Sequence, residues 1–287
     1  MTSLTPQQIN FIRRMLSFLP PPLRRATTGL WLDLGNLPER LRDPIRRADP
    51  WQTIHNVGAG DFRMSGKIIM DDLIAFGGLA PDDHVLDIGC GVGRVAMPLA
   101  AFLNPAGGYV GFDISPGPIK GCRRRFAQLR PDFRFEWLDV RNGDYNASGS
   151  IAETEVRFPC EDASIDLAFA TSVFSHVRIE TISRYLAEAA RVLRPGGRIV
   201  FTAYALTPER RAEIEAALTR EPFVPWQGSA MVVDPRSPER AIAHDADDLD
   251  AAIAAAGLRR DAPWRTGIWA PRSELIGWQD LWVAQKP

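Results

Sequence analysis

The sequence predicts an α/β fold built on an open sheet, and two observations support this. From His84 onward, short apolar runs alternate with helical segments, the pattern of strands and helices that alternate along the chain. At the first strand-to-helix turn, residues 85–94 read VLDIGCGVGR, so three alternating glycines follow a strand that ends in an acid. Because glycine has no Cβ, such a turn lets the backbone approach a ligand closely.

Residues 1–80 are predicted to form a helical N-terminal cap, and residues 81–287 the core. An amphipathic helix over residues 1–20 ends at three consecutive prolines. The cap is modestly basic, which we interpret as a solvated helical face rather than a site for an anionic partner.

The core elements follow in order. Strands are expected at residues 84–88, 109–114, 134–140, 165–170 and 198–204, with helices near 94–103, 116–129 and 179–193 between them. Pro98 predicts a kink or an irregular first turn in the first of these helices. A lid-like insertion is expected at residues 205–245, with a helix starting at Thr207-Pro208. A helix near 247–256 and strands near 258–269 and 280–285 complete the core.

The spacing of the glycines decides between cofactor classes. A dinucleotide fingerprint reads G-x-G-x-x-G, but its third glycine position here is Arg94, so the pattern is D-x-G-x-G-x-G. The second strand ends in Asp113, which suits the two hydroxyls of a ribose. The third strand ends in Asp139-Val140, which suits an adenine amino group and ring.

These motifs, together with LRPGGR at residues 193–198, resemble in content and order those of class I S-adenosylmethionine-dependent methyltransferases. The resemblance implies a Rossmann-like, seven-stranded sheet with an antiparallel last strand and helices on both faces. It also implies S-adenosyl-L-methionine as cofactor. The cofactor-binding residues that it predicts, which include the positions beside the two later acids and the end of the fourth strand, are Asp87, Gly89, Gly91, Gly93, Asp113, Ile114, Asp139, Val140 and Ala170.

In that resemblance, Asp87 orients the glycine loop and the amino group of the methionine part, and Asp113 holds the ribose. The catalytic candidate is His176, which follows the fourth strand and can accept a proton near neutral pH. Its alternative role is to hold the loop or a helix start. Tyr145, Asn146 and Trp226 are predicted to bind substrate, with packing as the alternative for the tryptophan.

The predicted reaction is O-methylation of a hydroxyl on a small molecule or a sugar or glycoconjugate. The alternatives are N- or C-methylation of a small metabolite, or a catalytically inactive cofactor-binding protein. A nucleic-acid partner is not expected, because the net charge is −1 and the core lacks both a basic tract and an Asn/Asp-Pro-Pro-aromatic tetrad. No metal site is expected, because the four histidines are isolated from one another and from the three cysteines. With no run of about 18 uncharged apolar residues and no signal-peptide core, a cytoplasmic protein without a transmembrane segment is expected. The sequence specifies neither the acceptor nor the oligomeric state.

Overall fold

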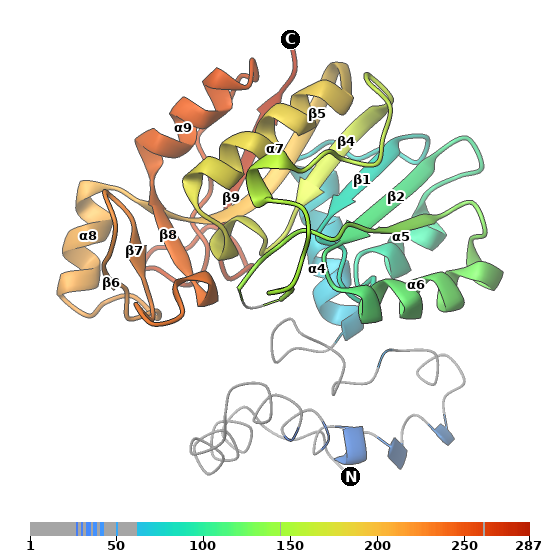
Figure 1. Cartoon of the computed structure of the whole chain (residues 1–287), viewed down its shortest axis with the longest axis horizontal. Coiled ribbons are helices and arrows are strands. Elements are labelled where there is room, and N and C mark those ends of the chain that lie inside the picture. Colours follow the sequence, from blue (N-terminus) through green and yellow to red (C-terminus); the bar gives the residue numbers. More distant parts are fainter. Residues whose placement is uncertain are drawn as a thin grey trace.

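The centre of the molecule is a twisted sheet covered by helices on both faces (Figure 1). The computed structural model describes residues 62–143, 145–260 and 262–287, together with residues 27, 30, 33–35, 37–38, 41–42 and 50. Within these residues the sheet has nine strands, in the order β3-β2-β1-β4-β5-β8-β7-β6, and β9 pairs with β5. The first five strands are β1 (His84–Ile88), β2 (Gly108–Asp113), β3 (Arg134–Trp137), β4 (Ile165–Ala170) and β5 (Leu193–Leu206). They pair in parallel, so their carboxyl ends meet at one edge of the sheet.

Two hydrophobic clusters lie on opposite faces of this sheet. On one face α7 (Ile179–Val192) and α9 (Ala246–Ala255) contribute buried residues such as Leu186 and Leu249. On the other face α4 (Phe62–Ala75), α5 (Ala96–Phe102) and α6 (Pro116–Leu129) contribute Leu73, Leu99 and Phe126. The predicted fold class is therefore confirmed. Helix α4 belongs to the predicted cap in sequence but packs as part of this core.

Local sequence explains where several helices begin. Helix α5 begins at Ala96, so Pro98 falls in its first turn. The amides of Met97 and Leu99 bond the carbonyls four residues earlier, and Pro98 has no N–H to make the bond between them. Residues 91–95 form the irregular turn that Pro98 predicts. Helix α6 begins at Pro116 and α8 (Pro208–Glu215) at Pro208, both with proline in the first turn. The side chain of Thr207 caps α8 by accepting a hydrogen bond from the Arg210 amide.

The predicted insertion extends the sheet. After α8 it forms β6 (Val224–Pro225), β7 (Met231–Val232), the short helix η3 (Pro238–Arg240) and β8 (Ile242–Asp245). Besides β4, strand β5 has two more partners: residues 198–203 pair with antiparallel β9 (Asp280–Gln285), and residues 204–206 pair with parallel β8. A third hydrophobic cluster, which includes Phe223, Met231 and Trp269, lies beneath this added part. Phe223 and Met231 therefore pack in the core of the insertion.

The strand count and one strand differ from expectation. The described residues form nine strands rather than seven, because the insertion adds β6, β7 and β8 while one of the seven expected strands is missing. The strand expected near residues 258–269 contributes only isolated bridges, Arg259 to Gln285 and Arg265 to Leu281. The two bridges differ in register by two residues, and Pro263 between them has no N–H to donate to a ladder. The antiparallel last strand, β9, has the predicted bounds.

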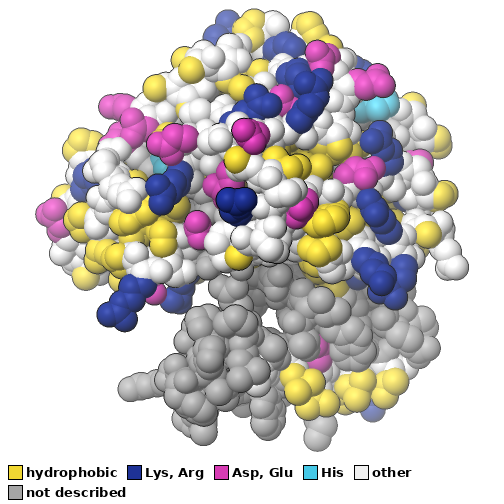
Figure 2. All heavy atoms as spheres, viewed as in Figure 1, with side chains coloured by type: hydrophobic (Ala, Val, Ile, Leu, Met, Phe, Trp, Pro, Cys, Tyr) yellow, Lys and Arg dark blue, Asp and Glu magenta, His cyan; other side chains and the backbone are white. Residues whose placement is uncertain are grey.

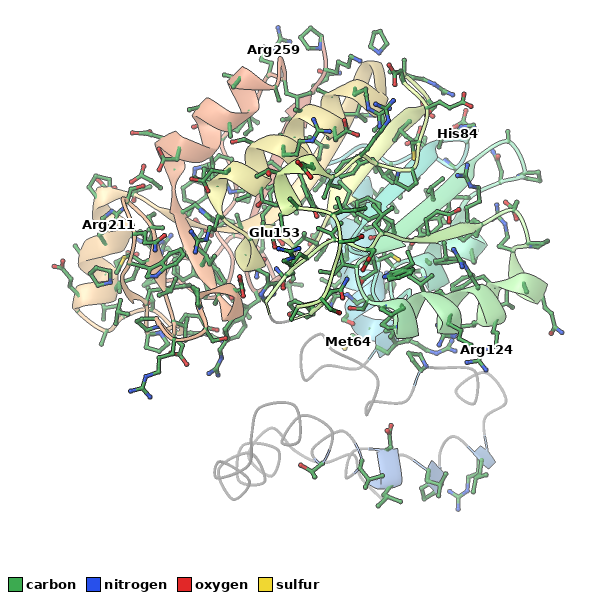
Figure 3. All side chains as sticks on the ribbon, in the orientation of Figure 1. Met64, His84, Arg124, Glu153, Arg211 and Arg259 are labelled. Carbon is green, nitrogen blue, oxygen red and sulfur yellow. The ribbon has the colours of Figure 1, made fainter. Side chains whose placement is uncertain are left out.

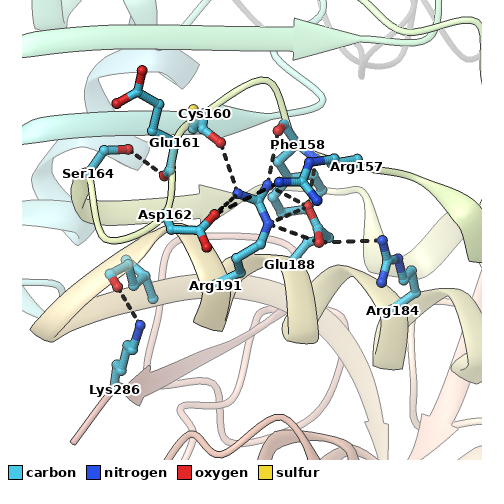
Figure 4. Close-up of polar contacts among 11 residues, drawn as sticks. Arg157, Phe158, Cys160, Glu161, Asp162, Ser164, Arg184, Glu188, Arg191 and Lys286 are labelled. Atoms are coloured by element: carbon cyan, nitrogen blue, oxygen red, sulfur yellow. Dashed lines mark hydrogen bonds and ion pairs between the residues drawn. The ribbon is translucent and has the colours of Figure 1, made fainter.

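A buried ion pair fastens the segment that leads into β4. The Glu188 carboxylate on α7 accepts a hydrogen bond from the Phe158 amide at 2.8 Å and pairs with Arg191 at 2.7 Å (Figure 4). Arg191 in turn donates to the carbonyls of Phe158 and Cys160 and pairs with Asp162. These bonds fix residues 158–162, the last part of the segment between β3 and β4, against α7.

The surface in Figure 2 carries Lys and Arg interspersed with Asp and Glu, in keeping with the net charge of −1. Among the described residues, no helix is both long and apolar enough to cross a membrane. The predicted helix over residues 1–20 lies outside the described part, and so does His55, to which the sequence gives no functional role.

Candidate functional site

The glycine loop joins β1 to α5 at the carboxyl edge of the sheet. Gly89, Gly91 and Gly93 all have positive φ (72°, 52° and 78°), a conformation that favours glycine. A Cβ on Gly89 would lie 2.5 Å from Cγ2 of Val173, and one on Gly93 would lie 3.1 Å from Sγ of Cys122. A Cβ on Gly91 would meet no atom of the described residues within 4 Å. Packing therefore requires two of the glycines, while the third faces space that a ligand can approach.

Asp113 at the end of β2 is bonded to this loop. Its Oδ2 accepts a hydrogen bond from the Gly91 amide at 2.9 Å, and its Oδ1 accepts one from the Ser115 amide at 2.8 Å. Burial raises the pKa of Asp113, and the two amide bonds oppose that shift. Each carboxylate oxygen has two lone pairs, so both oxygens retain capacity for ribose hydroxyls. Next to it, half-buried Ile114 accepts the indole N–H of Trp137 through its carbonyl at 3.1 Å.

Asp87 lies beneath the loop and is 3% exposed. Its Oδ2 accepts a hydrogen bond from the hydroxyl of Tyr109 at 2.7 Å. Burial raises the pKa of Asp87 to about 7, although Tyr109 and the charge of Arg94 act to lower it. The sequence analysis did not include Tyr109. The sequence feature that indicates this contact is Gly111, which pairs in register with Asp87. Because it has no side chain, it leaves room for the tyrosine hydroxyl to pass.

The third acid, Asp139, anchors the polar loop of residues 142–150. Asn146 donates to its Oδ1 at 3.0 Å, and the Ser150 hydroxyl donates to its Oδ2 at 2.8 Å. These bonds lower the pKa of Asp139. Asn146 also donates to the carbonyl of Val140, which is buried. The predicted adenine contacts and the predicted substrate residue Asn146 are therefore joined by direct hydrogen bonds.

The base of this loop is held by a second carboxylate. Glu153 accepts hydrogen bonds from Asn142 at 2.8 Å and from Thr181 of α7 at 3.0 Å. Asn142, which is buried, also accepts the Tyr145 amide through its side chain. In Figure 3, Glu153 lies near the middle of the view, between the half of the sheet that ends in β3 and the half that ends in β6.

Beyond β4, whose last residue Ala170 is fully buried, the chain turns over the glycine loop into the short helix η2 (Phe174–His176). Ser172 has a φ of +59°, and its amide donates to the hydroxyl of Thr202 at 2.8 Å. That hydroxyl donates to Gln279, which in turn donates to the Ser175 hydroxyl at 2.9 Å. The chain of hydrogen bonds fixes η2 against β5 and the start of β9. Val173 packs against Gly89 of the glycine loop, and His176 follows Val173 by three residues along the chain.

His176 contacts both the polar loop of residues 142–150 and the insertion of residues 205–245. Its Nδ1 lies 2.7 Å from the carbonyl oxygen of Glu239 in η3, and its ring meets that of Tyr145 edge-on at 5.6 Å. Trp226, the other predicted substrate residue, is half-buried with the guanidinium of Arg178 over its ring at 5.0 Å. Tyr145 and His176 are therefore brought together, and Trp226 contacts Arg178, which follows His176 by two residues.

His244 has a structural position. It is 2% exposed, its Nε2 bonds the Phe174 carbonyl of η2 at 3.1 Å, and burial lowers its pKa to about 4. The supporting roles of Thr202, Gln279 and Glu239 are not predicted from the sequence. Each lies far along the chain from the loop it supports, and none belongs to a local motif.

Residues 86–201 match a family model described as a methyltransferase domain. The chain is 37% identical over 144 residues to phthiotriol/phenolphthiotriol dimycocerosates methyltransferase 1 of Mycobacterium ulcerans, covering 49% of this chain and 44% of that protein. The chain spans less than half the length of the first curated relatives it matches, from 30% to 44%.

Two solved structures share the fold. A protein of Pyrococcus horikoshii superposes with a TM-score of 0.53 at 18% identity, covering 85% of this chain and 99% of its own. An S-adenosylmethionine-dependent methyltransferase from Clostridium acetobutylicum superposes with a TM-score of 0.50 at 12% identity, covering 88% and 98% of the two chains.

Proposed function

We propose that this protein is a class I, S-adenosylmethionine-dependent methyltransferase that methylates a hydroxyl oxygen; the match of residues 86–201 to a methyltransferase domain supports the methyl transfer. The donor is S-adenosyl-L-methionine, and the acceptor is a small molecule or a sugar or glycoconjugate.

One observation carries the donor assignment. Gly91 combines a positive φ, an amide bonded to the Asp113 carboxylate, and a Cβ position with no atom within 4 Å in the described part of the chain. A loop of this kind admits a ligand against its backbone, with an acid alongside that matches ribose hydroxyls. The residues present therefore fit an adenosyl ligand.

The chain's own residues have three tasks. Asp113 and the Gly91 backbone bind the adenosyl part, and Asp87 provides a carboxylate for the amino group. When bound, the cofactor supplies a methyl group on a positively charged sulfur, which is already activated. The protein then has to align the acceptor in line and accept its proton, and we assign the proton to His176.

Transfer to oxygen is supported by His176, since a hydroxyl is a weak nucleophile until a general base removes its proton, whereas a neutral amine is already nucleophilic. The name of the Mycobacterium ulcerans relative specifies a triol, an acceptor with hydroxyl groups. Another relative, from Symbiobacterium thermophilum, is named a demethylmenaquinone methyltransferase and is 32% identical over 127 residues. The acceptors named for these relatives differ, so N- or C-methylation is the second candidate.

Calorimetry with S-adenosylhomocysteine tests the donor assignment. We expect binding to the full chain, loss of binding in Asp113→Ala, and wild-type binding in Asp82→Ala, a change at an exposed aspartate before β1. Wild-type affinity in Asp113→Ala would overturn the donor site.

A screen of glycosides, phenols and amines, read out as S-adenosylhomocysteine production, tests the acceptor class. We expect turnover with hydroxylated acceptors. Turnover with amines alone would replace the proposal by N-methylation, and cofactor binding without any turnover would favour an inactive cofactor-binding protein.

A further inference from the structure

The hydrogen bond between His176 and Glu239 joins residues 63 positions apart in the chain. His176 ends η2, which follows β4 in the methyltransferase core, whereas Glu239 belongs to η3 of the insertion. The bond from Nδ1 to the carbonyl oxygen is short, at 2.7 Å. The insertion therefore reaches the candidate base through its backbone.

The chemistry of the two atoms fixes the proton. A backbone carbonyl oxygen has lone pairs and no hydrogen, so it can only accept. Nδ1 must then carry the hydrogen of the bond. A neutral imidazole has a single N–H, so its proton-accepting lone pair lies on Nε2.

Three further contacts surround His176 and η3. A Cβ on Gly143 of the polar loop would collide with the carboxylate of Glu239, so loop and η3 are closely packed there. The ring of Tyr145, two residues on, meets His176 edge-on. On the other side, the Arg240 amide donates to the Ser237 carbonyl at 3.1 Å, which closes the turn that presents the Glu239 carbonyl.

We propose that the Glu239 carbonyl is a positioning group that holds His176 in the Nδ1–H tautomer, so that Nε2 is the atom that accepts the proton of the acceptor hydroxyl. This inference rests on the methyl-transfer function proposed above. In the proton step the O–H bond breaks, its electron pair stays on the acceptor oxygen, and the proton forms the Nε2–H bond. The resulting imidazolium keeps its Nδ1–H bond to Glu239, which stabilises the positive charge.

The insertion is then part of the reaction machinery and not only a cover. A residue's backbone carbonyl is available whatever its side chain, so the role belongs to the position of η3 and not to glutamate. In metal sites, partners that set the orientation and tautomer of a histidine are worth about 10- to 100-fold in activity when lost, and we expect a loss of the same order here.

The first experiment is a ¹⁵N NMR measurement of the histidine rings in the full-length protein, with His176 assigned by its absence in His176→Asn. We expect the shift pattern of a neutral ring protonated at Nδ1. A ring protonated at Nε2 would overturn the inference, whether or not methyl transfer is found.

The second experiment compares two variants that separate the two nitrogens. Replacing His176 by δ-N-methylhistidine removes the bond to Glu239 and leaves the Nε2 lone pair, so kcat should fall about 10- to 100-fold with little change in the acceptor KM. His176→Asn keeps a donor near Nδ1 and removes Nε2, so kcat should fall by about 10²- to 10⁴-fold.

Wild-type kcat in the δ-N-methyl protein would refute the positioning role. Failure of the wild-type protein to methylate any acceptor would instead refute the proposed function, and the NMR result would still report the tautomer.

Discussion

Gly91→Ala separates the cost of backbone conformation from the cost of filling the cofactor cradle. Gly91 has a φ of +52°, and among the residues that the structure describes no atom would lie within 4 Å of its Cβ. The fold therefore suffers only the left-handed backbone of a non-glycine residue, about 1–2 kcal/mol, which the stiffer unfolded chain offsets by about 0.4–1 kcal/mol. A net loss of about 1 kcal/mol is expected in the free energy of unfolding.

The same methyl group intrudes on the bound cofactor. Adding a methyl to a filled site costs about 1–3 kcal/mol, which corresponds to an affinity loss of about 5- to 150-fold. Gly257→Ala is the matched control, because Gly257 also has a positive φ, at 74°, and open space at its Cβ, but lies at the end of α9. Urea denaturation should give similar stabilities for both variants, and calorimetry with S-adenosylhomocysteine should show weak binding only for Gly91→Ala. Equal affinity in the two variants would refute the assignment of Gly91 to the cofactor site.

Three further predictions concern the same region. Burial raises the pKa of Asp87 to about 7, so the free protein holds a proton on this carboxylate below that pH. Cofactor affinity should therefore fall about tenfold per pH unit below about 7. Calorimetry of Asp87→Asn should show no such dependence on pH. Burial lowers the pKa of His244 from 6.5 to about 4, so the unfolded chain binds the proton first and stability should fall as the pH drops from about 6.5 towards 4; urea denaturation of His244→Gln should lack that loss. Asn146→Ala removes the bonds to Asp139 and Val140 and should raise the acceptor KM with little change in cofactor affinity, whereas the exposed Ser148→Ala should change neither; a KM unchanged by Asn146→Ala would contradict a substrate role for the loop.

Elements with strong local signals were predicted with their bounds. Strands β1, β4 and β9 and helix α6 run over the residues expected, because each apolar run is closed by glycine, proline or a turn. The small strands β6 and β7 were not predicted. Each has two residues and exists only through pairing with a neighbour, so its formation depends on tertiary contacts that no local pattern records.

The site residues likewise divide into those that local sequence predicts and those that depend on tertiary contacts. Asp87, Gly91 and Asp113 belong to motifs whose spacing is fixed by single turns of the chain, and the structure brings them together. Gln279 supports Ser175 from 104 residues away, and nothing in its own surroundings indicates that role. Glu239 is less predictable still, because it acts through a backbone carbonyl that every residue has.

The position of Asp139 ties the donor and acceptor halves of the site together. Its two oxygens already hold Asn146 and Ser150, so the loop that carries Tyr145 to His176 is anchored on the acid expected to meet the adenine amino group. A carboxylate has capacity for about four hydrogen bonds, so adenine can share it without displacing the loop. A ligand that adds a bond to Asp139 fixes the same carboxylate that orders the loop. We therefore expect cofactor binding to order the acceptor side of the site, and acceptor binding to be tighter once the cofactor is bound, because such coupling is reciprocal.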